Sequence, residues 1–171
     1  MPQSDRNGEA QCVWIVKGST KPKVLNASGY PAQIPEPRLP DLCEVRSTPD
    51  MGMGVFAKHD IERGEIILAE RPLLVIPENI VGATPSEFES LLEAAVGRLS
   101  PESQADFKEL QNSFSSDQCA GRPLLGIVKT NNYTIGNLFD GSNMSENYVI
   151  VNKVASRINH RCVSLAPFSP Q

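Results

Sequence analysis

The sequence predicts an α+β fold of short strands interrupted by a helical segment, and three observations support this prediction. Strand-like runs separated by turn residues occupy residues 42–76. Two amphipathic stretches with helix-starting residues follow between residues 84 and 114. A β-branched run, Tyr148–Val151, comes after them. Strands, then helices, then strands again are typical of the α+β class.

Composition narrows the classes of function. The 171 residues are 40% apolar and 21% charged, which is ordinary for one domain with a core. The net charge of −4, with no dense basic cluster, argues against direct binding of nucleic acid and suits a basic peptide partner. The apolar run Val13–Val16 is too short for a signal peptide or a membrane span. We therefore expect an intracellular protein of the nucleus or cytoplasm that does not bind membranes.

The four cysteines are far apart in the sequence and form no C-x-x-C pair. This spacing predicts reduced thiols and no zinc site.

Residues 1–40 are rich in proline, and we expect them to form a largely disordered arm. Proline lacks the amide donor and restricts the residue before it, so the segment YPAQIPEPRLP (residues 30–40) cannot sustain a helix or a central strand. The alternative is that Cys12–Val16 adds an edge strand to the domain behind it.

Four short strands are expected in the next part of the chain, arranged as a compact β-meander. They are Cys43–Ser47, Gly54–Lys58, Glu65–Ala69 and the fully apolar run Leu73–Ile76, with turn chemistry at Thr48–Gly52.

The helical segment begins at Thr84-Pro85-Ser86-Glu87, which has the pattern of a capping box with proline at the first helical position. An apolar face follows at helical spacing and predicts core packing; its residues are Phe88, Leu91, Leu92, Ala95 and Val96. Ser100-Pro101 opens a second helix. Leu124–Val128 begins a third one that runs toward Asn131, and the polar residues 136–147 predict a loop.

The candidates for chemistry are few. Gly52-Met53-Gly54 would allow a backbone to approach a ligand closely, although most such triplets are only turns. His160 and Cys162 lie on one segment, which is a poor arrangement for a nucleophile and its base. Asn159 and His160 could equally be polar groups that cap a turn. His59 is expected to be exposed, so neither a metal site nor a catalytic residue is assigned.

Taken in order, these pieces resemble the SET domain of protein-lysine methyltransferases. The segment VRSTPDMGMGVFAKHDIERGEIILAERPLLVIP (residues 45–77) is similar to the opening hairpins of that family. The segment SRINHRC (residues 156–162) is similar to its signature loop. The helical segment between them, including LLGIVKTN, resembles the branch of the SMYD and fungal SET proteins. The resemblance covers about residues 43–163.

The resemblance implies a SET-domain-like β-fold over residues 41–163, with a helical insert at about 84–130. It also implies that S-adenosylmethionine is the cofactor. Gly52, Met53 and Gly54 would cradle it, and Asn159 and His160 would hold its two ends. The substrate would be a lysine-bearing protein or peptide such as a histone tail, and the family's catalysis is mainly positioning.

The sequence departs from the family after Cys162, where the family has a Pro-Asn step and this chain has Val163-Ser164-Leu165. The family's later strands and its catalytic tyrosine segment have no match here, so we expect a SET fold that is incomplete at the C-terminus. Residues 164–171 are expected to form an unstructured tail. The chain as written should be inactive or weakly active. The alternatives are a non-catalytic protein-interaction module and a truncated gene product.

Overall fold

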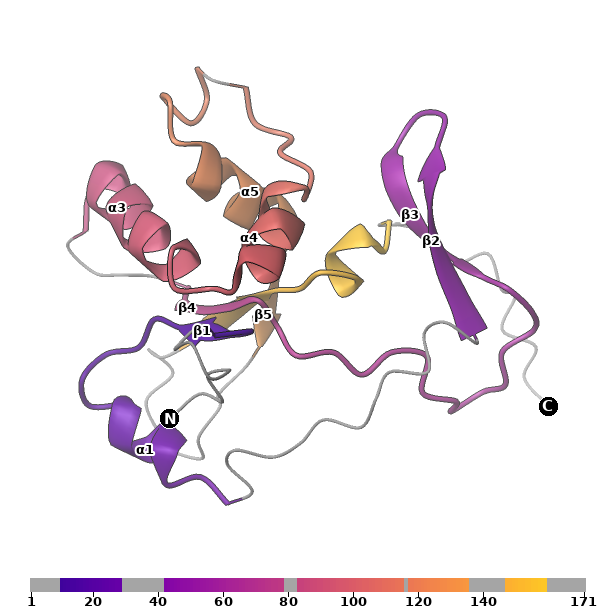
Figure 1. The fold of residues 1–171 in the computed structure, drawn as a ribbon, viewed down its shortest axis with the longest axis horizontal. Helices are drawn as coiled ribbons and strands as arrows, with labels where there is room; N and C mark the ends of the chain where they lie inside the picture. The colour runs from indigo at the N-terminus through magenta and orange to yellow at the C-terminus, as the bar shows by residue number, and fades with distance from the viewer. Residues whose placement is uncertain (1–9, 29–41, 79–82, 116, 136–146, 160–171) are drawn as a thin grey trace.

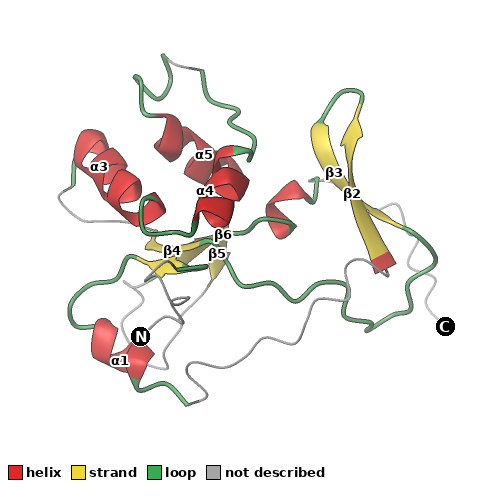
Figure 2. Ribbon diagram, viewed as in Figure 1, coloured by secondary structure: helices red, strands yellow, loops and turns green. Residues whose placement is uncertain are grey.

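The structure is a computed structural model, and it describes residues 10–28, 42–78, 83–115, 117–135 and 147–159. It is a mixed α+β fold, as predicted (Figure 2). The elements in chain order are β1 (Val13–Trp14), α1 (Lys21–Leu25), β2 (Cys43–Thr48), β3 (Gly52–Ala57), β4 (Leu74–Pro77), α3 (Pro85–Val96), α4 (Pro101–Lys108), α5 (Pro123–Asn131), β5 (Asn132–Ile135), β6 (Tyr148–Val151) and η1, a 3₁₀ turn (Ala155–Arg157).

Four strands form the main sheet, in the order β1-β4-β6-β5. Strand β4 is parallel to β1 and antiparallel to β6, and β6 is antiparallel to β5. Helices α3, α4 and α5 cover one face of this sheet (Figure 1). The predicted apolar strand is confirmed as β4, whose residues are all buried because side chains pack against it on both faces.

The second sheet is the hairpin β2–β3, which pairs Cys43 with Ala57 and Thr48 with Gly52. The predicted meander is therefore wrong, because β4 joins β1 and β6 and not the hairpin. The strand expected at Glu65–Ala69 is also absent, and these residues form part of the connection between the two sheets. Ile66 pairs with no strand among the described residues and is 72% exposed despite its β-branched side chain.

The helical segment is confirmed, and its start is built as the sequence predicts. Thr84 and Glu87 form both bonds of the capping box. Leu92, Ala95 and Val96 lie in the core, whereas Leu91 is 41% exposed, so the buried face is narrower than its predicted apolar stripe. Strand β5, directly after α5, was not predicted.

The N-terminal part of the predicted arm carries the edge strand that the sequence offered as the alternative. Val13 and Ile15 donate backbone hydrogen bonds to Leu73 and Val75 of the main sheet. Burial raises the pKa of the adjacent Cys12 thiol to about 11. Helix α1 also lies within the predicted arm, and its Val24 is buried, so residues 10–28 are ordered rather than disordered. Residues 1–9 and 29–40 of the arm, the predicted loop at 136–146 and the tail at 164–171 lie outside the described residues.

Candidate functional site

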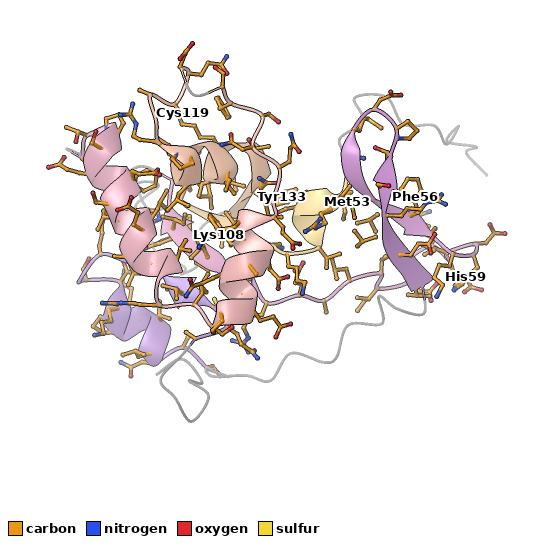
Figure 3. All side chains as sticks on the ribbon, turned by 45° about the horizontal axis from the view of Figure 1, so that its top comes forward. Met53, Phe56, His59, Lys108, Cys119 and Tyr133 are labelled. Atoms are coloured by element: carbon orange, nitrogen blue, oxygen red, sulfur yellow. The ribbon has the colours of Figure 1, made fainter. Side chains whose placement is uncertain are left out.

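A cleft of about 400 Å³ opens where the hairpin meets the C-terminal ends of α4 and α5. Four chain segments contribute to it, and we call this site the cleft throughout. Its lining residues are Met51, Met53, Glu109, Leu110, Gln111, Ser113, Thr130, Asn131, Asn132, Tyr133, Ser156, Arg157, Ile158 and Asn159. Figure 3 shows Met53 on the hairpin side and Tyr133 on the helical side.

The cleft brings together the two sequence blocks that were predicted to form one site. A Cβ atom added to Gly54 would lie only 3.0 Å from Nδ2 of Asn159, which is closer than ordinary packing allows. It would also meet the Phe56 ring at 3.1 Å and the Thr48 methyl group at 3.3 Å. A larger residue at this position would therefore push against the Asn159 amide, the Phe56 ring and the Thr48 methyl group.

The hairpin turn presents the two methionines. Gly52 adopts a φ of 69°, a left-handed conformation that favours glycine. The Thr48 hydroxyl accepts a hydrogen bond from the Met51 amide at 2.9 Å and donates one to the Gly52 carbonyl at 2.9 Å. Met51 and Met53, which line the cleft, are 63% and 40% exposed. The hairpin side of the cleft is thus apolar and accessible to a ligand.

The segment that carries Asn159 is held by groups distant in the sequence. The Glu70 carboxylate accepts hydrogen bonds from the amides of Val154 and Ala155, at 2.8 and 2.9 Å. The Tyr133 hydroxyl donates to the Ala155 carbonyl at 2.7 Å. The Ser156 hydroxyl donates to the Asn131 carbonyl at 2.9 Å. These bonds hold η1 between the main sheet and the hairpin (Figure 1).

Desolvation raises the pKa of Tyr133 above its usual value, and the nearby charge of Glu70 raises it further. The phenol therefore keeps its proton and donates its hydrogen bond to Ala155 throughout the neutral pH range. Tyr148, in contrast, is only 1% exposed and packs beside Val75 in the core.

The end of α5 supplies the polar wall of the cleft. Asn131 is buried, and its Nδ2 donates to the carbonyls of Gln111 at 2.6 Å and Ile127 at 2.7 Å. The next residue, Asn132, donates from Nδ2 to the Val128 carbonyl at 2.9 Å. Because both amide nitrogens are engaged by backbone carbonyls, the amide oxygens are the groups that these side chains can offer to a hydrogen-bond donor.

Both signs of charge lie at the rim of the cleft. Arg157 reaches Glu109 with 3.7 Å between its guanidinium nitrogen and the carboxylate. Its Nε also donates to the Lys153 carbonyl at 3.2 Å, so the guanidinium is fixed in place. The arrangement can therefore accommodate a ligand that carries both an anionic and a cationic group.

The predicted site residues have different outcomes. Gly52 and Gly54 lie on the hairpin beside the cleft, while Met53 and Asn159 line it. His160 and Cys162 lie outside the described residues. His59 is exposed, and its ring lies 2.7 Å from the Asp60 carbonyl oxygen. Among the described residues no group of three or more His, Cys, Asp or Glu could hold a metal ion.

Sequence reasoning assigned no role to three residues that shape the site: Asn131, Tyr133 and Glu70. The stretch LLGIVKTN was noted only as similar to one branch of a family. The amide pair at the end of its predicted helix was the one local signal that could have identified Asn131 and Asn132. Nothing near Glu70 or Tyr133 in the sequence indicates that they meet the segment before Asn159, because those contacts are long-range.

No protein-family model matches this chain, and searches of the curated proteins and of the solved structures found no significant match. In the described ranges, no helix has both the length and the apolar character needed to cross a membrane.

Proposed function

We propose that the cleft binds S-adenosylmethionine, and that the chain is a SET-type protein related in function to protein-lysine methyltransferases. The observation that carries this proposal is the contact between Gly54 and Asn159. These residues come from two segments about a hundred positions apart, and the family resemblance independently gave both a cofactor role. Their packing beside one cleft is what a shared cofactor site requires.

The chemistry of the cleft suits this ligand. Its volume of about 400 Å³ is within the usual range of small-molecule sites. Met51 and Met53 offer an apolar surface, and the amide oxygens of Asn131 and Asn132 can accept hydrogen bonds from amino groups. Arg157 and Glu109 match the carboxylate and ammonium of the cofactor's amino-acid end.

S-adenosylmethionine would supply an electrophilic methyl group, and the acceptor would be the neutral amine of a lysine in a protein or peptide such as a histone tail. In this proposal the chain's own residues bind and orient. No described tyrosine has a hydroxyl free for that amine, because Tyr133 is bonded to Ala155 and Tyr148 is buried. We therefore expect cofactor binding to be readily measurable and methyl transfer by this chain to be weak.

Isothermal titration calorimetry with S-adenosylmethionine tests the proposal. The wild-type protein should bind the cofactor, and Asn159→Ala should weaken binding by about tenfold, the effect of losing one hydrogen bond of about 1.4 kcal/mol. Asn26→Ala is the matched control, since Asn26 is an exposed asparagine after α1 and does not line the cleft. It should leave the affinity unchanged.

Two results would contradict this assignment. One is a wild-type protein that is folded by circular dichroism but shows no binding at millimolar cofactor. The other is equal affinity for ATP and S-adenosylmethionine, which would indicate a nucleotide site instead. In a parallel assay with labelled cofactor and a lysine-rich peptide, rapid methyl transfer would contradict only the expected weakness of catalysis.

A further inference from the structure

We propose that Glu70 is a positioning residue for the cofactor site: its carboxylate fixes η1 and thereby sets the place of Asn159 against Gly54. The expected effect of Glu70 on cofactor binding rests on the proposed function. Its effect on the position of Asn159 can be tested without any ligand. Glu70 lies in the connection that leads into β4, far from Asn159 in the sequence.

The Glu70 carboxylate caps η1 with two hydrogen bonds, one to each of its oxygens. Oε1 of Glu70 accepts from the Val154 amide at 2.8 Å, and Oε2 accepts from the Ala155 amide at 2.9 Å. The first amides of a helical turn have no partner within the turn and need an acceptor from elsewhere. Bonds to a carboxylate are roughly twice as strong as those to a neutral acceptor. Glu70 therefore provides the strongest constraint on the start of η1.

The turn is too short to hold its own position. It spans Ala155–Arg157, with two backbone hydrogen bonds, from Arg157 to Val154 at 2.8 Å and from Ile158 to Ala155 at 3.0 Å. The chain beyond it is exposed: Ile158 and Asn159 are both accessible. Short helical turns of this kind depend on contacts with the rest of the fold. The position of Asn159 therefore depends on the contacts that hold η1 in place.

The consequence for binding follows from the tightness of the site. The amide of Asn159 lies so close to Gly54 that one added carbon atom would force its neighbours to shift. Binding constellations must be held within about 0.5 Å of their productive geometry to be effective. A small shift of η1 would therefore separate Asn159 from the hairpin and open the cleft, while the core of β4 and β6 would stay packed.

The chain contains a matched control in Glu89. Its carboxylate makes the same kind of two-pronged cap, accepting from the amides of Leu124 at 3.0 Å and Leu125 at 2.8 Å. This cap sits at the start of α5, the opposite end from the cleft residue Asn131. Glu89→Gln should therefore weaken the fold in a similar way without moving Asn159.

The experiment compares Glu70→Gln with Glu89→Gln in the full chain. Glutamine has nearly the same shape, but its NH₂ group cannot accept a hydrogen bond, so it can satisfy only one of the two amides. The ligand-free readout is the nuclear Overhauser effect between the Asn159 side-chain amide and the Gly54 Hα protons. It should be lost in Glu70→Gln and kept in Glu89→Gln, while cross-strand contacts within β2–β3 persist in both variants.

Calorimetry with S-adenosylmethionine then measures the consequence for binding. Glu70→Gln should weaken affinity about tenfold, whereas Glu89→Gln should change it less than twofold even though both lower the melting temperature. Glu70→Asp, with a shorter carboxylate that reaches one amide, should fall between wild type and Glu70→Gln. It also serves as the test variant if Glu70→Gln does not fold.

Several results would overturn the inference. One is an intact Asn159–Gly54 contact in Glu70→Gln, and another is an equal loss of affinity in Glu89→Gln, which would mean that general stability controls binding. If the wild-type protein binds no cofactor, the proposed function fails. The nuclear Overhauser comparison still decides in that case whether Glu70 positions Asn159.

Discussion

Gly54 and Asn159 define the site at the scale of single residues. From the sequence, the expected role of Gly54 is to let a ligand approach the backbone closely. The structure gives a different immediate reason, since a Cβ at this position would be crowded by the side chain of Asn159. The two glycines of the G-x-G triplet thus have separate roles: Gly52 makes the turn, and Gly54 receives Asn159.

Gly54→Ala should displace Asn159 and weaken cofactor binding about tenfold. The added methyl group would lie 3.0 Å from Asn159 Nδ2 and 3.1 Å from the Phe56 ring, and overpacking of this kind costs about 1–3 kcal/mol. The measurement is calorimetric titration with S-adenosylmethionine.

Gly18→Ala is the control for this substitution, because a Cβ at Gly18 meets nothing within 4 Å and its φ is not in the left-handed range. Unchanged affinity in both variants would show that the Gly54–Asn159 contact has no part in binding. An equal loss in both would show that the effect is not specific to the cleft.

At the scale of elements, predictions succeeded where the signal is local. Thr84 and Glu87 form the capping box that their spacing indicates, and the apolar run Leu73–Ile76 predicted the buried strand β4, which spans Leu74–Pro77. Strand β5 was missed because Asn132–Ile135 is a run of only four residues directly after a helix, and the pairing with β6 that defines the strand is not visible in the sequence. The strand at Glu65–Ala69 was expected from composition, but no strand in the part of the chain that the structure describes pairs with it.

The capping box also makes a prediction about pH. The Thr84 backbone amide, bonded to the Glu87 carboxylate at 2.7 Å, lowers the pKa of Glu87 below its usual 4.5, and the Thr84 hydroxyl contributes further. A lowered pKa in the folded state stabilises the fold above pH 4.5, and this contribution disappears as the pH falls through the lowered value. Glu87→Gln keeps a capping group that does not titrate.

The test is the difference in melting temperature between wild type and Glu87→Gln as a function of pH. The wild type should be the more stable above pH 4.5, and the gap should close as the pH falls below it. The control is Glu93→Gln, at the exposed C-terminal end of the same helix. It should not lower the melting temperature above pH 4.5, because a negative charge there gains nothing from the helix dipole. A gap that stays constant with pH would refute the linkage.

At the scale of the whole molecule, the cleft lies at the junction of two separately paired sheets. The sequence allowed both blocks of the site to be named, but it could not show how they meet. Glu70, Tyr133 and Asn131 connect the blocks through contacts between distant positions, and such contacts leave no periodic pattern in the sequence. The meander prediction failed for the same reason, because strand order depends on long-range pairing.

The central claim is that the hairpin and the segment around Asn159 form one cofactor site. The most direct test is a titration of isotope-labelled protein with S-adenosylmethionine, followed by the backbone amide signals in nuclear magnetic resonance. The claim predicts saturable shifts at Gly52–Gly54, Asn131–Tyr133 and Arg157–Asn159 together, with the amides of α1 unmoved. Shifts in only one of these segments, or none at saturating cofactor, would contradict it.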